Sequence, residues 1–234
     1  MWVAGVDGCR AGWIVALRHL ESGELRCRLL ARIAEVDSLD EKPQRLAIDM
    51  PIGFADIAGK GGRDCERAAR ALLPGKSSSV FSLPCRAALA ATDYREALKL
   101  NRASGPDKVG LSQQGFHLLD KLRDLDSWIT PARQRRCIEA HPELAFALVN
   151  GGKPVLSRKR QPEGRAERLR LLKRGGISVP RSMIETRPKG CAIDDLLDAI
   201  MLTRTAERHL RGGAVCLPPK PPRDARRLQM AIWY

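Results

Sequence analysis

The sequence is poor in aromatic residues and has no long hydrophobic run. Phenylalanine, tryptophan and tyrosine make up only 4% of the 234 residues, which is too few to supply the extended base-stacking platform of a single-strand-binding protein. No apolar stretch reaches the ~18 residues of a membrane-spanning helix. The first residues have neither the basic nor the small-residue region of a secretory signal. We therefore expect a cytoplasmic protein without membrane contacts.

Paired cysteine motifs are also absent. The seven cysteines are an odd number, are widely spaced and form no C-x-x-C pair. This pattern excludes a typical zinc-thiolate site and a disulfide framework, and it favours reduced, mostly buried thiols. Internal repeats and low-complexity segments are missing as well. We expect a single domain that covers residues 1–234.

Acidic residues are outnumbered by basic ones. The chain has 41 lysines and arginines against 27 acids, a net charge of +14 and an isoelectric point near 10.0. Much of the excess lies in residues 151–190, where twelve basic residues face three glutamates and give +9. Such a concentrated basic surface attracts polyanions, of which nucleic acid is the usual one, although it could also serve solubility alone.

The hydrophobic pattern predicts a mixed α/β layer fold. Strands are expected at residues 2–7, 12–18, 24–30, 45–49 and 136–140, with a further one near 228–234. Helices are expected at 33–40, 64–73, 84–91, 93–103, 112–128, 142–149, 163–174 and 193–210. Three hairpin-linked strands followed by strands that alternate with helices favour a mixed sheet. The helical segment from about 55 to 130 would be an insertion between the fourth and fifth strands.

Three acidic residues stand where apolar strands end. Asp7 ends the first strand, Asp49 ends the fourth, and Glu139 lies near the end of the fifth. Ligands of open α/β sheets bind at the carboxyl ends of strands. Each of these acids alone could instead form a turn or cap a helix, and Glu139 could point to solvent.

A further acidic group opens the apolar helix at 193–210. Asp194 is the expected N-cap, and Asp195 and Asp198 share one helix face because they are three residues apart. Asp195 could simply complement the helix dipole. Asp198 lies deeper, beside apolar residues of the packing face, and a buried acid requires a partner such as a metal ion.

Clustered carboxylates repel one another unless a cation lies among them. Hard oxygen ligands without cysteine suit Mg²⁺ or Mn²⁺, and two such ions can cleave a phosphodiester bond. The metal ligands expected from the sequence are Asp7, Asp49, Glu139, Asp195 and Asp198. Together with the basic segment, which would hold phosphates, they predict a metal-dependent nuclease.

Several other residues are candidates for the same site. His141 follows Glu139 by two positions, so both point the same way on a strand, and it could bind metal, transfer a proton or form a structural turn beside Pro142. A second group could contact phosphate, or could be solvated or cap helices instead: Arg63, Ser78, Ser79, Arg86 and Lys159.

The arrangement of acids resembles the ribonuclease H-like fold, and within it the RuvC-like Holliday-junction resolvases. That group takes its acids from strand one, strand four and a D-x-x-D-A sequence in the C-terminal helix. The resemblance implies that Asp7, Asp49, Asp195 and Asp198 are the corresponding residues here. The chain departs from the group at strand four, where the acid is usually glutamate and is Asp49 here.

The whole chain also resembles a prokaryotic family catalogued as a domain of unknown function and predicted to consist of RNase H-like nucleases. The matching stretches are residues 5–13, 48–53, 63–66, 78–81, 139–143, 194–199 and 231–234. The resemblance implies an RNase H-like mixed sheet and nuclease activity, although a fold alone does not establish function.

Two other functions remain open from the sequence. A non-catalytic nucleic-acid-binding protein could have kept the same fold. An actin-like phosphotransferase also begins with a glycine-rich hairpin around an acid, but it needs a second such hairpin, and only one is found. The sequence leaves the oligomeric state, the choice between DNA and RNA, and the mode of cleavage undetermined.

Overall fold

The architecture is built on a hairpin whose two strands are apolar on both faces. The computed structural model describes residues 1–234, and its main sheet has five strands in the order β3-β2-β1-β4-β5. Strands β1, β2 and β3 are antiparallel neighbours, whereas β4 and β5 run parallel to β1. The strands are β1 (Trp2–Cys9), β2 (Gly12–His19), β3 (Leu25–Leu30), β4 (Leu46–Asp49) and β5 (Cys137–Glu139).

Helices fill the long connection from β4 to β5 and most of the chain after it. Between those strands lie α1 (Asp64–Ala71), α2 (Tyr94–Ala103), α3 (Gln113–His117), α4 (Leu119–Trp128) and α5 (Pro131–Gln134). After β5 come α6 (Pro142–Val149), α7 (Pro162–Arg174), α8 (Arg181–Glu185) and α9 (Ile193–Leu210). None of them is both long and apolar enough to span a membrane.

Short elements complete the chain. Three are 3₁₀ helices, η1 (Ile33–Ser38), η2 (Ser77–Ser79) and η3 (Arg86–Ala90). Two are short strands, β6 (Cys216–Leu217) and β7 (Ile232–Trp233), which pair with each other. Trp233 also bridges to Ala140 just beyond β5, so the C-terminal end of the chain lies beside the main sheet.

Local details differ from the sequence-based expectations at four places. The helix expected at 33–40 is the short 3₁₀ helix η1. The helix expected at 112–128 is two helices, because the Leu118 N–H bonds the nearby Gly115 carbonyl at 3.3 Å and Gly115 is a weak helix former. The segment expected as a helix at 84–91 forms only η3. Ala192, not Asp194, is the N-cap of α9, and its N–H donates to the Asp195 carboxylate at 3.1 Å.

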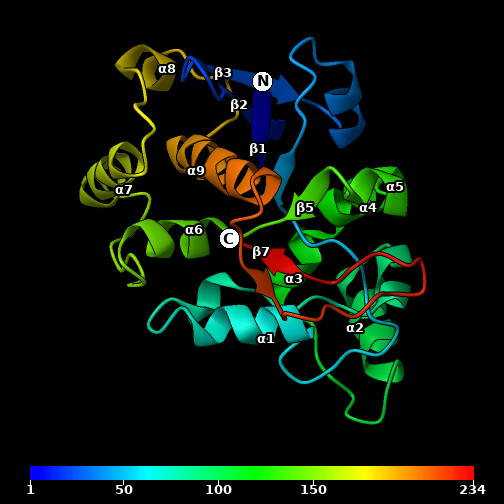
Figure 1. Ribbon diagram of the computed structural model, residues 1–234. Coiled ribbons are helices and arrows are strands. Elements are labelled where there is room, and N and C mark those ends of the chain that lie inside the picture. The colour runs from blue at the N-terminus through cyan, green and yellow to red at the C-terminus, as the bar shows by residue number, and fades with distance from the viewer.

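The alternation of side chains along the strands assigns each residue to one of two faces. On one face, Ile14 packs with α9 residues such as Leu197 and Ile200. The register pairs Asp7 with Ile14 on β2 and with Asp49 on β4, so both acids lie on this α9 face. In Figure 1, α9 (orange) lies across β1 (dark blue).

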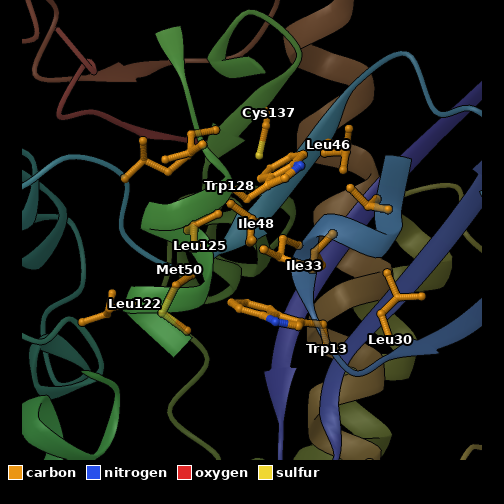
Figure 2. Close-up of a cluster of buried hydrophobic side chains, with 14 of the residues drawn as sticks. Trp13, Leu30, Ile33, Leu46, Ile48, Met50, Leu122, Leu125, Trp128 and Cys137 are labelled. Carbon is orange, nitrogen blue, oxygen red and sulfur yellow. The ribbon is translucent and has the colours of Figure 1, made fainter. Parts of the chain in front are cut away.

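The opposite face carries the largest hydrophobic cluster. Figure 2 shows Trp13 and Ile48 from the sheet together with Leu122, Leu125 and Trp128 of α4. The indole N–H of Trp13 donates to Asp124 at 2.7 Å, which satisfies the only polar atom of that buried ring. The helical segment between β4 and β5 is therefore packed onto the sheet and shares its core.

Helix α9 approaches β1 unusually closely because residue 5 is glycine. A Cβ atom on Gly5 would lie 1.9 Å from the Ala199 carbonyl oxygen and 2.7 Å from the Thr203 nitrogen. Only a residue without a side chain permits that distance between two backbones. The close contact brings the first turns of α9 to the strand that carries Asp7.

Candidate functional site

Two acids stand side by side at the carboxyl edge of the sheet. Asp7 and Asp49 are register partners on neighbouring parallel strands, so their side chains project from the same face. Neither carboxylate accepts a hydrogen bond from a protein group, and both line a cleft of about 340 Å³. This placement leaves their oxygens available to a ligand.

A third acid reaches the same position from α9. Asp198 is only 2% exposed, and its Oδ2 atom accepts a hydrogen bond of 2.7 Å from Lys159 Nζ. The same ammonium lies 3.8 Å from Asp194, one turn earlier on the helix. Lys159 belongs to the basic segment between α6 and α7, so that segment is anchored at the acidic cluster.

Burial and mutual repulsion raise the pKa values of all three acids. Burial raises the pKa of Asp7 well above its usual range, and the charges of Asp49 and Asp198 raise it further. Burial also raises the pKa of Asp49, although His141 and Lys159 oppose the shift. The pKa of Asp198 is raised to about 6 by burial despite the nearby Lys159 ammonium. Perturbed carboxylates in a cleft are typical of functional sites.

The charge of Lys159 is set by the same cluster. Burial lowers the pKa of its ammonium, but Asp198, Asp7 and Asp49 raise it more strongly, so the net pKa lies above the usual value. Lys159 is therefore protonated at neutral pH. It supplies the only lysine contact to this acidic group, which it partly neutralises.

Glu139 is held differently from the other predicted acids. Its register partner is Ile48, so it lies on the sheet face opposite Asp49. Arg63 Nη1 and Nη2 bind its two oxygens at 3.0 and 2.5 Å, and the Ile52 N–H donates to it at 2.7 Å. The prediction that Glu139 binds metal is untested, and in this structure its oxygens are already occupied by these donors.

Arg63 lines the cleft, but its guanidinium is buried and fully engaged by protein groups. Its guanidinium also binds Glu66 at 2.7 Å and the carbonyl oxygens of Ile52 and Gly53 at 2.8 and 3.1 Å. Glu66 in turn accepts a hydrogen bond from the Leu83 N–H. Arg63 therefore joins α1, the loop after β4 and β5 into one network beneath the site.

The β5–α6 junction adds a histidine and an acid to the site. His141 Nε2 lies 3.1 Å from the Ser79 carbonyl oxygen, so this nitrogen carries the proton and Nδ1 is left without a partner. Glu143, to which we gave no role from the sequence, raises the pKa of both Asp49 and Asp198. An acid directly after Pro142, in the first turn of a helix that follows a strand end, was the sequence pattern that could have indicated this position.

The remaining predicted phosphate contacts are spread over different surroundings. Ser79 lines the cleft and its hydroxyl donates to the Lys76 carbonyl at 2.8 Å, while Ser78 is exposed outside it. Arg86 forms ion pairs with Asp126 and Asp224 and does not contact the cluster of Asp7, Asp49 and Asp198. Asp195 caps α9 and lines a separate shallow pocket with Arg10 and Arg160.

The donor set fits a hard divalent cation. Buried carboxylate oxygens of Asp198 and Glu143 have no hydrogen-bond partner, which is costly unless a cation or water satisfies them, whereas the free oxygen of Asp194 faces Arg160 at 3.5 Å. Only oxygen ligands are offered at Asp7, Asp49 and Asp198, as Mg²⁺ and Mn²⁺ prefer. As the side chains stand, with Lys159 among them, no group of three or more His, Cys, Asp or Glu residues already encloses a metal position.

An Asp7→Asn variant is expected to be more stable than the wild type at neutral pH. Since the pKa of Asp7 is raised in the folded protein, the ionised carboxylate destabilises the fold above pH 3.8 and not below it. Each kcal/mol relieved by the neutral amide should raise the melting temperature by about 2–4 °C. Thermal unfolding of both proteins from below pH 3.8 to neutral pH tests the prediction. A lower melting temperature of Asp7→Asn than of the wild type at neutral pH would contradict it.

The fold and the site together define a class of protein. The sheet order, the antiparallel β1–β3 meander, the parallel β4 and β5 and the helices between them form the RNase H-like topology, which confirms the predicted fold. This topology is compatible with phosphodiester hydrolysis. A family model described as "Protein of unknown function (DUF429)" matches residues 5–223, and the chain belongs to that family. No curated protein and no solved structure matches this chain.

Proposed function

We propose that the protein is a divalent-metal-dependent nuclease that hydrolyses phosphodiester bonds of nucleic acid. One observation carries this proposal. Asp7 and Asp49 are paired on adjacent parallel strands at the carboxyl edge, and α9 places Asp198 against them, each with a raised pKa. Three repelling carboxylates beside a cleft favour a cation among them.

Each residue of the cluster has a distinct role in this proposal. Asp7, Asp49 and Asp198 would hold Mg²⁺ or Mn²⁺, which when bound activates water and stabilises the leaving oxygen. Lys159, already protonated, would contact a phosphate oxygen once its carboxylate partners bind the cation. His141 Nδ1, which has no partner and lies close enough to Asp49 to affect its pKa, would accept a proton. Glu139 would act indirectly, by fixing the loop after β4 through Ile52.

The basic segment supplies the expected contacts to the nucleic-acid backbone. Lys159 and Arg160 both lie beside Asp194, and Arg160 shares a shallow pocket with Arg10 on the hairpin. These cations stand next to the acidic cluster, where a phosphate strand would need to be neutralised. Binding should therefore weaken steeply as the salt concentration rises.

Cleavage of labelled DNA and RNA with Mg²⁺ or Mn²⁺ tests the proposal. The wild type is expected to cut at least one of single-stranded, duplex or branched substrates, whereas Asp7→Asn is expected to lose this activity, because an amide does not replace an anionic metal ligand. Chelation with EDTA should also abolish it. Equal activity in wild type and Asp7→Asn would contradict the proposal. Tight, salt-dependent binding without cleavage would instead favour a non-catalytic nucleic-acid-binding protein.

A further inference from the structure

The cleft next to Asp7 and Asp49 has an apolar wall that phosphodiester hydrolysis itself does not require. Its volume of about 340 Å³ lies at the lower end of the ~300–1,000 Å³ range of ligand pockets. Phe81 is 37% exposed and stands at this wall, although large hydrophobic side chains are mostly buried elsewhere. The larger apolar side chains of its lining include Met50, Val80, Phe81, Leu83 and Leu118.

The segment that carries Phe81 is fixed at both sides but leaves its own polar groups free. Arg70 donates to the Val80 carbonyl at 2.8 Å, and the Leu83 N–H donates to Glu66 at 3.2 Å. The peptide groups of Phe81 and Ser82 between them form no hydrogen bond within the chain. The wall thus combines one aromatic ring with unpaired donors and acceptors held in place, which suits a flat, polar-edged ligand.

A lysine also lines the cleft. The Lys121 side chain passes Gly8, the residue after Asp7, and its ammonium is 5.0 Å from the centre of the Trp13 ring. Lys121 has no carboxylate partner within salt-bridge distance, unlike Lys159 and Arg63. It also lines a second pocket with Arg32 and Arg123, which pair there with Asp124 and Asp120, so Lys121 is the cation of that pocket without a carboxylate partner.

We infer that the cleft receives one nucleobase that has left its stack, beside Asp7 and Asp49. The base would stack on Phe81 and pair its edge with the free peptide groups of Phe81 and Ser82, while Lys121 binds the adjacent phosphate. A duplex cannot present a base in this way without unstacking it. The inference rests on the proposed nuclease function and specifies its substrate class, a single-stranded, branched or otherwise unpaired region.

Binding measured without metal separates this inference from the cleavage reaction. The probe is a short single-stranded oligonucleotide with a central 2-aminopurine, titrated with wild-type protein in EDTA. Its emission is expected to rise as the labelled base leaves its neighbours. Phe81→Ala should weaken binding roughly 5- to 100-fold, the loss of one aromatic stack, whereas Phe81→Trp should retain affinity.

Two controls make the result specific to the cleft. Leu72→Ala removes a hydrophobic side chain of similar exposure outside the cleft, and it should bind the oligonucleotide as the wild type does. The fully paired form of the same oligonucleotide should bind Phe81→Ala and wild type equally, since its bases remain stacked.

The outcomes distinguish this inference from the proposed function. Unchanged affinity in Phe81→Ala, or 2-aminopurine emission that stays at the stacked level, overturns the nucleobase site even if metal-dependent cleavage occurs. Base capture that depends on Phe81 supports the site even if no substrate is cut, in which case only the nuclease proposal fails.

Discussion

Asp198→Asn is expected to lower metal-dependent cleavage by about 10³-fold, a loss of about 4 kcal/mol of transition-state stabilisation. The substitution keeps the size of the side chain but removes the negative charge that would share a cation with Asp7 and Asp49. It also replaces the charge-assisted hydrogen bond of 2.7 Å from Lys159 by a weaker one to an amide oxygen. The variant should fold normally, because relief of a buried carboxylate with a raised pKa offsets the lost ion pair.

Asp194→Asn is the matched control for Asp198. Asp194 lies one turn earlier on α9, is equally buried and is also near Lys159, at 3.8 Å. It does not contribute to the raised pKa values of Asp7 or Asp49. We expect less than a tenfold loss of cleavage. Mn²⁺ titration by calorimetry should show weakened binding in Asp198→Asn only. An Asp198→Asn protein that cleaves within tenfold of wild type would exclude its role as ligand.

Arg63→Met is expected to cause the largest loss of stability, about 3–5 kcal/mol, because it leaves two buried glutamates without their cation. Arg63 and its partners Glu66 and Glu139 are each less than a tenth exposed. The melting temperature should fall by about 2–4 °C for each kcal/mol. Urea unfolding measures the change directly.

The pH dependence of this effect has a defined sign. Burial raises the pKa of Glu139 and Arg63 opposes that shift, so removing Arg63 raises the pKa further. The destabilisation should therefore be largest at neutral pH and shrink as the pH falls through the further raised pKa of Glu139, below which its carboxyl is neutral and no longer needs Arg63. Adding Glu139→Gln to Arg63→Met should recover part of the loss.

Arg67→Met provides the comparison on the same helix. Its ion pair with Asp64 is exposed, and such pairs contribute about 0–1 kcal/mol. A loss in Arg63→Met no larger than that in Arg67→Met would show that the network beneath the cleft does not stabilise the fold.

The sequence predicted the sheet from local pattern, and it predicted four acids that converge at its edge. Asp7, Asp49 and Asp198 do meet there, whereas Glu139 lies on the opposite face. Apolar runs that end in Asp7 and Asp49 indicate strand ends, and parallel strands place such ends together. The spacing of Asp198 from the start of its helix indicated a buried, inward position. The order of strands and helices along the chain already indicated the sheet topology, and this topology brings the three acids together.

The basic residues that pair with Asp198 and Glu139 could not be predicted from local pattern. Lys159 meets Asp198 across 39 residues of chain, and Arg63 meets Glu139 across 76. Periodicity indicates which face a side chain occupies, but not which of 41 basic residues reaches it. Phe81 was overlooked for a related reason, since one aromatic residue in a polar loop forms no pattern.

The close contact between Gly5 and Ala199 has a consequence for the order of events during synthesis. The strand that carries Asp7 leaves the ribosome first, whereas the helix that carries Asp198 follows nearly 200 residues later. Until that helix docks, the nascent chain holds only two of the three repelling carboxylates. A partly synthesised chain therefore has no complete acidic cluster, so under the proposed function the metal site forms only once α9 has docked onto β1.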